Sequence, residues 1–173
     1  RLYDLDFKNQ RSYLVNTGGL KVDSYLSSDT HINCGEYGRN FVLGNIYGGS
    51  NHRLILPLYD PELNLTADPE SGFQVLYDTP GFHLDAWINW QSFIFESDTH
   101  QESFVAGVTS EIRFNSPKSK WHTYMPIQMV AQHRGGEIDD TETSVETFMN
   151  GSVGLGLTWN ANLGRLKRLN WEL

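Results

Sequence analysis

The chain has 173 residues, which is enough for one domain of ordinary size. Thirteen Lys and Arg residues against 21 Asp and Glu residues give a formal net charge of −8, which argues against nucleic-acid binding because phosphate contacts need clustered cations. The single cysteine, Cys34, excludes an intrachain disulfide framework and a cysteine zinc site. No apolar run reaches roughly 18 residues, the length that a transmembrane helix requires.

Alternation of apolar and polar residues predicts β-strands along most of the chain, and helical periodicity is hard to find. In chain order, the predicted strands cover residues 20–26, 31–37, 40–47, 73–78, 82–94, 104–114, 123–133, 149–159 and 166–173. The runs 82–94 and 104–114 form the clearest antiparallel pair, since only a short polar connection separates them. Pro126 indicates an edge, a bulge or a strand start within 123–133.

Two long acidic connections, 56–71 and 135–144, lack alternation and are predicted to be surface loops of a single domain, 1–173. The last predicted strand stops without a turn, and the chain begins with Arg1. We therefore expect the sequence to be the front part of a longer protein. The predicted class is all-β, an antiparallel up-and-down β-barrel, transmembrane and incomplete.

Three observations favour a membrane barrel over a soluble sandwich or barrel. Three strands reach about the 9–11 residues that cross a bilayer, whereas globular strands peak at about 5–6. The face opposite the apolar one is often small and polar, as in Gly154 and Gly156 of the run 149–159. Tyr and Trp residues fall near strand ends, where an interfacial aromatic girdle would lie.

Alternation also assigns side chains to faces. The lumen-lining set is predicted to be Asp85, Asn89, Glu111, Arg113, Asn150, Ser152 and Thr158. The apolar, lipid-facing set is predicted to be Leu84, Ile88, Val153, Leu155 and Leu157. Trp87 and Phe93 fall on the polar side, so they would stack on sugar rings, pack against an internal plug or show that the assignment is inverted there.

Several segments resemble uncharacterised, porin-like outer-membrane β-barrel proteins of Bacteroidota-type bacteria. They are residues 45–55, 57–62, 87–95, 131–139 and the glycine-rich strand after Met149. The resemblance implies an outer-membrane location without implying a substrate. One departure is the last residue, Leu173, because outer-membrane barrels typically end in an aromatic residue.

No motif predicts a catalytic or metal site. The six histidines are scattered, without the HxH or HExxH spacing of a zinc site. The acidic run 59–70 offers oxygen ligands for calcium, but its residues do not follow the order of an EF-hand loop. Acidic side chains that are simply exposed to solvent in a loop are the simpler interpretation. Asp85 and Glu111 could form a glycosidase pair, but nothing singles them out. Arg165, Lys167 and Arg168 follow a turn and fit a membrane rim or a solvated turn equally well.

The leading functional hypothesis is a bacterial outer-membrane barrel that acts as a passive pore or envelope scaffold. It is expected to be no enzyme, to bind no cofactor or nucleic acid, and to have membrane lipid and small solutes as partners. The oligomeric state, the solute and an open or plugged lumen stay undetermined. The alternative is a soluble periplasmic or secreted β-sandwich that binds carbohydrate through exposed aromatics such as Trp87 and Trp90. A third option is a barrel with an enzymatic loop site.

Overall fold

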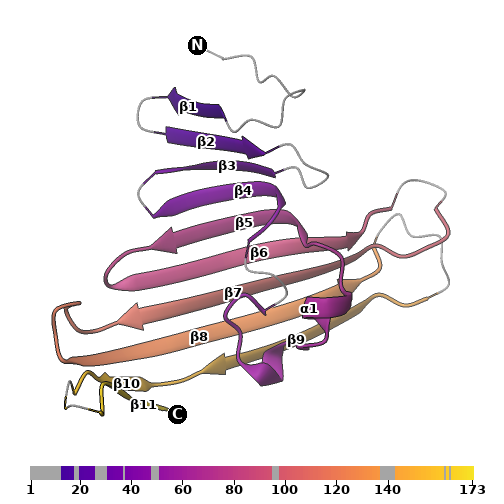
Figure 1. Ribbon diagram of the computed structural model, residues 1–173. Coiled ribbons are helices and arrows are strands. Elements are labelled where there is room, and N and C mark those ends of the chain that lie inside the picture. Colours follow the sequence, from indigo (N-terminus) through magenta and orange to yellow (C-terminus); the bar gives the residue numbers. More distant parts are fainter. Residues whose placement is uncertain are drawn as a thin grey trace.

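Antiparallel strands make up almost all of the regular structure in the computed structural model (Figure 1). The structure describes residues 13–17, 20–25, 31–36, 38–47, 51–94, 98–136, 143–161, 163 and 165–173. Within these residues the strands are β1 (Tyr13–Thr17), β2 (Leu20–Tyr25), β3 (His31–Glu36), β4 (Arg39–Asn45), β5 (Ser71–Asp78), β6 (Phe82–Ser92), β7 (Ser103–Arg113), β8 (Trp121–Arg134), β9 (Glu146–Val153), β10 (Gly156–Trp159) and β11 (Leu169–Glu172). The helical elements are η2 (Leu56–Leu58) and α1 (Leu63–Thr66). The all-β prediction is confirmed.

The described strands form one sheet in which neighbours in the chain are neighbours in space. The hydrogen-bonded order runs from β1 to β8 and continues to β10 and β11, while β9 also pairs with β8. The two ends of this order, β1 and β11, do not pair with each other, so the sheet is open. An open, up-and-down antiparallel sheet is consistent with part of a barrel.

β9 and β10 follow each other along one edge of β8, where the sequence predicts a single strand, 149–159. The interruption lies opposite Pro126, which has no N–H to give to a partner strand. The N–H of Gly154 still donates to the carbonyl of Pro126 at 3.0 Å, but the next residue, Leu155, pairs with Leu173 instead. The proline thus divides the predicted strand in two.

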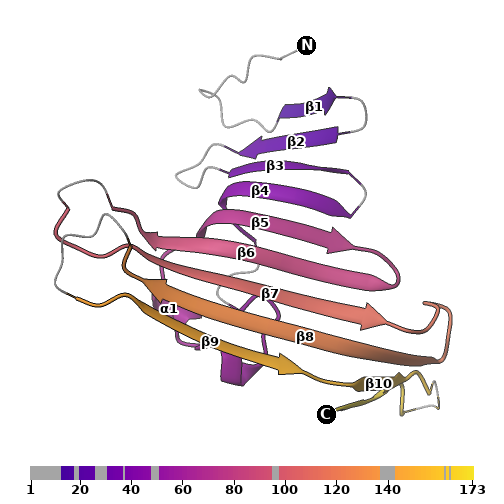
Figure 2. The ribbon, with the colours of Figure 1, turned by 180° about the vertical axis from the view of Figure 1, so that it is seen from behind.

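Residues 46–70 connect β4 to β5 and cross one face of the sheet, and we call them the β4–β5 segment (Figures 1 and 2). All of it is described except 48–50. Most of the buried side chains lie between this segment and the sheet. They are Val42, Gln74, His83, Asp85, Trp87, Thr109 and Gln128 from the strands, and His52 and Leu54 from the segment. We call this covered side the inner face.

The opposite, outer face has no such cover among the described residues. Val153 is 71% exposed, and the large side chains of Phe41 and Leu43 on β4 are also exposed. Among the residues predicted to face lipid, Leu155 is exposed and Leu84, Ile88 and Leu157 are partly exposed. Among the described residues, no helix combines the length and the apolar character needed to cross a membrane.

The structure describes all of the first acidic connection, 56–71, but only the two ends of the second, 135–144. The first contains η2 and α1 and ends where β5 begins at Ser71, and most of its residues are exposed. Of the second, residues 137–142 lie outside the described residues.

Trp87 lies on the inner face, where its cross-strand neighbour on β7 is Gly107. A Cβ atom built on Gly107 would overlap the indole ring of Trp87. The indole is 4% exposed and stacks on His52, with ring centroids 3.8 Å apart and an interplanar angle of 7°. The indole ring is therefore held between Gly107 and His52, and it has no space to move away from a side chain added at Gly107.

We predict that Gly107→Ala destabilises the protein by about 1–3 kcal/mol, because the added methyl group overpacks the indole against His52. Gly81→Ala is the matched control, since a Cβ there meets only the carbonyl of Arg113 at 3.9 Å. Equilibrium denaturant unfolding followed by tryptophan fluorescence measures both. Equal stability of the two variants would contradict the packing described for Trp87.

Candidate functional site

His52 lies at the centre of a buried cluster that joins the β4–β5 segment to the sheet. Its Nδ1 atom is 2.9 Å from Oδ2 of Asp85 on β6, and its Nε2 atom is 2.6 Å from Oε2 of Glu70 at the end of the segment. The ring is 1% exposed. Both ring nitrogens are therefore engaged by carboxylates, and neither is free to take a proton from water.

The electrostatics of this cluster favour the charged form of the ring. Burial disfavours an imidazolium and lowers the pKa of His52, but hydrogen bonds to Asp85 and Glu70 and the charges of both carboxylates outweigh burial and raise this pKa above 6.5. An imidazolium can donate a hydrogen bond from each nitrogen. We call His52, Asp85 and Glu70 the histidine clasp.

Two buried glutamines of the sheet hold the backbone of the segment on either side of His52. The Gln74 amide donates to the carbonyl of Tyr47 at 2.8 Å and accepts from its N–H at 2.9 Å. The same amide also donates to Oδ1 of Asp85 at 2.8 Å. Gln128 donates to the carbonyl of Arg53 and accepts from the N–H of Ile55, both at 2.9 Å. These bonds satisfy backbone groups that have no strand partner.

The turn that carries His52 is strained. His52 and Arg53 have φ values of 39° and 59°, in the left-handed region that residues with a Cβ rarely adopt. The hydroxyl of Thr109 donates to the carbonyl of His52 at 3.0 Å and holds the turn against β7. Strain of this kind costs on the order of 1–3 kcal/mol per residue and persists only where the surroundings enforce it.

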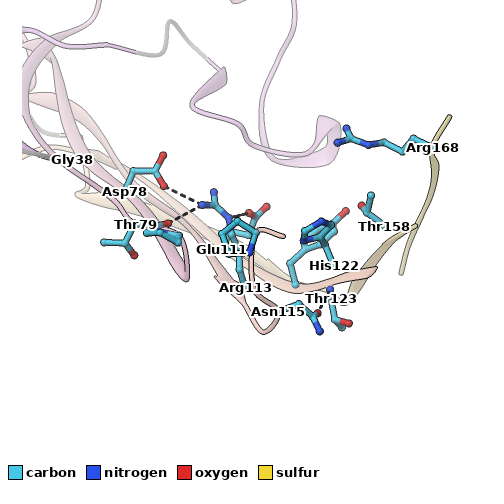
Figure 3. A pocket seen from close by; sticks show the side chains of 13 residues that line it. Gly38, Asp78, Thr79, Glu111, Arg113, Asn115, His122, Thr123, Thr158 and Arg168 are labelled. Atoms are coloured by element: carbon cyan, nitrogen blue, oxygen red, sulfur yellow. Dashed lines mark hydrogen bonds and ion pairs between the residues drawn. The ribbon is translucent and has the colours of Figure 1, made fainter. Parts of the chain in front are cut away.

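A cavity of about 860 Å³ lies on the inner face, near the turns that follow β5 and β7 (Figure 3). Arg113 sits at its centre and donates to Oε1 of Glu111 at 2.6 Å, to Oδ1 of Asp78 at 3.2 Å and to the carbonyl of Thr79 at 2.9 Å. His122, Thr158 and Arg168 line the opposite side. The cavity is thus mixed in charge, with acids that are already paired to Arg113.

A smaller cavity of about 190 Å³ lies between the β4–β5 segment and strands β6 to β8. It shares Glu111 and Tyr124 with the larger cavity, and Arg53 and His83 also line it. His83 is 7% exposed, and neither of its ring nitrogens has a hydrogen-bond partner. Within the described residues, these are the only buried side-chain nitrogen or oxygen atoms left without one.

The strand pairing puts several of the predicted polar residues together. Asp85 and Glu111 are on the inner face in the clasp and the cavities, Arg113 and Thr158 line the larger cavity, and the Asn89 side chain accepts from the N–H of Ser71 at 3.0 Å. Asn150 and Ser152, which pair with Val130 and Gln128 on β8, line neither cavity. Whether this face lines a lumen stays a prediction.

Four inner-face side chains are not among the predicted site residues: His52, Gln74, His83 and Gln128. His83 stands on the polar side of the run 82–94, so its alternation could have singled it out. His52 follows no periodic pattern, and its partners are 18 and 33 residues away. Residue spacing alone therefore could not have found the histidine clasp.

The structure also shows where the residues of the calcium, zinc and carbohydrate hypotheses lie. In the acidic run 59–70, Glu70 is committed to His52, whereas Asp60, Glu62 and Asp68 are exposed. Across the part of the chain that the structure describes, no three His, Cys, Asp or Glu residues are arranged to hold a metal ion. Trp87 is buried beneath His52 and is not available to a sugar, so its proposed role in carbohydrate binding is wrong. Phe93 is exposed and stacks on Trp90.

We predict that His52→Gln lowers the free energy of unfolding by about 3–5 kcal/mol at neutral pH, because the buried carboxylate of Asp85 and the partly buried carboxylate of Glu70 lose their cation. Since the pKa is raised in the folded state, the contribution of the imidazolium is complete below pH 6.5 and is lost as pH rises through the folded-state pKa. Denaturant unfolding at a series of pH values should show this loss in the wild type but not in the variant. His100→Gln, at an exposed histidine, is the control. An unchanged pH dependence in His52→Gln would contradict the assignment.

Comparison with known proteins gives the family. A family model described as Lipid A 3'-O-deacylase-type matches residues 22–173, and no curated protein and no solved structure matches the chain. The family is named for an enzyme, so the expectations of a passive pore or scaffold and of a non-enzyme are wrong, and nothing in the match identifies a porin. The carbohydrate-binding alternative gains no support either. Because the match extends over most of its length, the chain belongs to the lipid A 3'-O-deacylase-type family.

Proposed function

We propose that the protein is an outer-membrane enzyme that hydrolyses an ester-linked acyl chain of lipid A. The observation that carries this proposal is the family match over residues 22–173, since a 3'-O-deacylase by name removes an acyl group from an oxygen. The products of hydrolysis would be a free fatty acid and a sugar hydroxyl. The lipid partner is then lipid A itself.

The two faces of the sheet support a lipid environment. The outer face exposes Val153, Leu155, Phe41 and Leu43 without a covering element among the described residues. Such a surface is unfavourable in water and stable against hydrocarbon. We propose that it faces lipid in the outer membrane, and that Leu84, Ile88 and Leu157 belong to the same surface.

The inner face supports hydrolysis, because ester cleavage needs water, a base and a group that stabilises an oxyanion. The two cavities lie on this face and are lined by histidine, arginine and carboxylate side chains. A volume of about 860 Å³ falls in the range of about 300–1,000 Å³ that is typical of small-molecule sites. Part of an acylated sugar could enter it.

We predict that the full-length protein removes one acyl chain from lipid A when it is expressed in a Gram-negative host that lacks such an activity. Mass spectrometry of extracted lipid A should show a loss that corresponds to one ester-linked chain, and the purified protein should release an equal amount of free fatty acid from lipid A in detergent micelles. Cells with an empty vector are the control. Unchanged lipid A in cells that hold the folded protein in the outer membrane would overturn the proposed function.

The membrane placement is tested by adjacent residues on opposite faces. We predict that Val153→Lys lowers membrane stability by about 2–4 kcal/mol if it lies near the bilayer midplane, because the lysine would enter hydrocarbon. Ser152→Lys, on the inner face of the same strand, is the matched control and should be tolerated better. Folding into lipid vesicles, measured by urea titration, compares the two variants. Equal tolerance would contradict a lipid-facing Val153.

A further inference from the structure

The connections between strands differ in charge at the two ends of the sheet. Because the strands are antiparallel and run up and down, successive connections lie at alternate ends. The long connections 46–70, 93–102 and 135–145 share one end, and Arg53 is the only Lys or Arg among their acidic residues. The opposite end, which we call the short-turn end, lies to the left in Figure 1. Its connections contain no Asp or Glu, and they are 18–19, 37–38, 79–81, 114–120 and 160–168.

The Lys and Arg side chains of the short-turn end lie in two neighbouring connections. They are Lys118, Lys120, Arg165, Lys167 and Arg168, which are all exposed, and we call them the basic rim. The connections that carry them are neighbours because Trp121 pairs with Trp159, and the N–H of Asn160 donates to the carbonyl of Lys120 at 2.8 Å. Among the described residues, no member of the basic rim forms an ion pair, and Arg168 donates to the side-chain oxygen of Asn160. The rim is therefore a patch of positive charge without paired acids, in a chain whose net charge is −8.

Tryptophan side chains of the outer face lie beside the basic rim. Trp121 stands an even number of residues from Ile127, the partner of the exposed Val153, so it lies on the same face of the sheet. It is 48% exposed and stacks on Trp159, with ring centroids 5.2 Å apart and an interplanar angle of 9°. Trp171 on β11 is exposed on this face as well. Tryptophan favours the boundary between hydrocarbon and water, because its ring is apolar and its N–H is polar.

The order of these groups matches the layers of a membrane. With the outer face in hydrocarbon, the tryptophans would lie where the hydrocarbon ends, and the basic rim would lie just beyond them, at the level of the lipid headgroups. Ammonium and guanidinium groups donate charge-assisted hydrogen bonds to phosphate oxygens. Outer-membrane barrels turn their short connections toward the periplasm. An anionic lipid surface would repel the acidic connections at the other end, so charge complementarity confines the contact to the short-turn end.

We propose that the basic rim binds the phosphate groups of anionic phospholipids in the periplasmic leaflet of the outer membrane. Lys118, Lys120, Arg165 and Lys167 supply the charge, and the stacked rings of Trp121 and Trp159 hold the lipid-facing side of the site. This lipid-binding surface goes beyond the proposed hydrolysis and rests only on the membrane placement of the outer face.

The test compares how closely two lipids approach the tryptophans of the full-length protein in vesicles. The vesicles consist of phosphatidylcholine, and a fixed fraction of the lipid is brominated phosphatidylglycerol or, in parallel, brominated phosphatidylcholine. Bromine quenches tryptophan fluorescence on contact. At low salt the wild type should bind phosphatidylglycerol more strongly by about fivefold or more, since each cation near an anionic surface contributes about that factor. At about 1 M salt the preference should disappear, because charges are then screened within about 3 Å.

Matched double variants locate the effect. Arg165→Gln/Lys167→Gln removes two cations of the basic rim and should lower the preference by about threefold or more. Arg53→Gln/Arg134→Gln removes two exposed cations from the opposite end and should keep the wild-type preference. Both variants leave every tryptophan in place, so the difference between them reports the rim. Both should fold, because all four side chains are exposed.

The outcomes separate this surface from the proposed function. Equal quenching by the two lipids in the wild type would overturn the proposal. A preference that Arg165→Gln/Lys167→Gln keeps, or that Arg53→Gln/Arg134→Gln loses to the same extent, would overturn it too. Inorganic phosphate that removes the preference, at an ionic strength at which sodium chloride does not, would indicate a site for free phosphate and overturn the lipid assignment.

A protein that does not fold into the vesicles would contradict the membrane placement, and this proposal with it. The experiment measures no fatty-acid release. A lack of hydrolytic activity would therefore overturn the proposed function and leave the lipid preference as it is.

Discussion

The arrangement of the inner face depends on the pairing of His52 with two carboxylates. The β4–β5 segment has only η2 and α1 as regular structure, so most of its backbone groups need partners from elsewhere. Polar side chains of the sheet supply them, and a charged cluster becomes buried beneath the segment. Burying Asp85, and Glu70 in part, would be unfavourable without a cation between them. The imidazolium of His52 meets that need and fixes the segment to the sheet at the same point.

The requirements of this segment also explain the composition of the strands. The inner-face positions of β5, β6, β7 and β8 include Gln74, Asp85, Thr109 and Gln128, each of which bonds to the segment or to another residue of the clasp. Within the part of the chain that the structure describes, the outer-face positions of these strands make no such contacts and are mostly apolar. Gly107 fits the same scheme, since only a residue without a side chain leaves space for Trp87 beneath His52. A polar inner face is therefore a consequence of what covers it.

The sequence predicted the strands well because alternation is a local property. The runs 82–94 and 104–114 became β6 and β7 with shifts of only one or two residues at their ends. The division of 149–159 could not be read from that run, because its cause, Pro126, lies on the neighbouring strand. His52 could not be assigned at all, since its function in the fold comes from contacts with residues far away in the chain. Trp87 looked misplaced on a polar face because its partner ring lies in a loop.

The error over function has a related origin. A polar inner face with an apolar outer face is common to pores and to membrane enzymes, so alternation does not distinguish them. What differs is whether the inner face holds reactive groups in place. Here the strain at His52 and Arg53 costs on the order of 1–3 kcal/mol per residue and is sustained by the clasp, by Thr109 and by Gln128. The same turn places Arg53, whose side chain is exposed, among the residues that line the smaller cavity. The clasp thus connects the stability of the fold to the geometry of the proposed site.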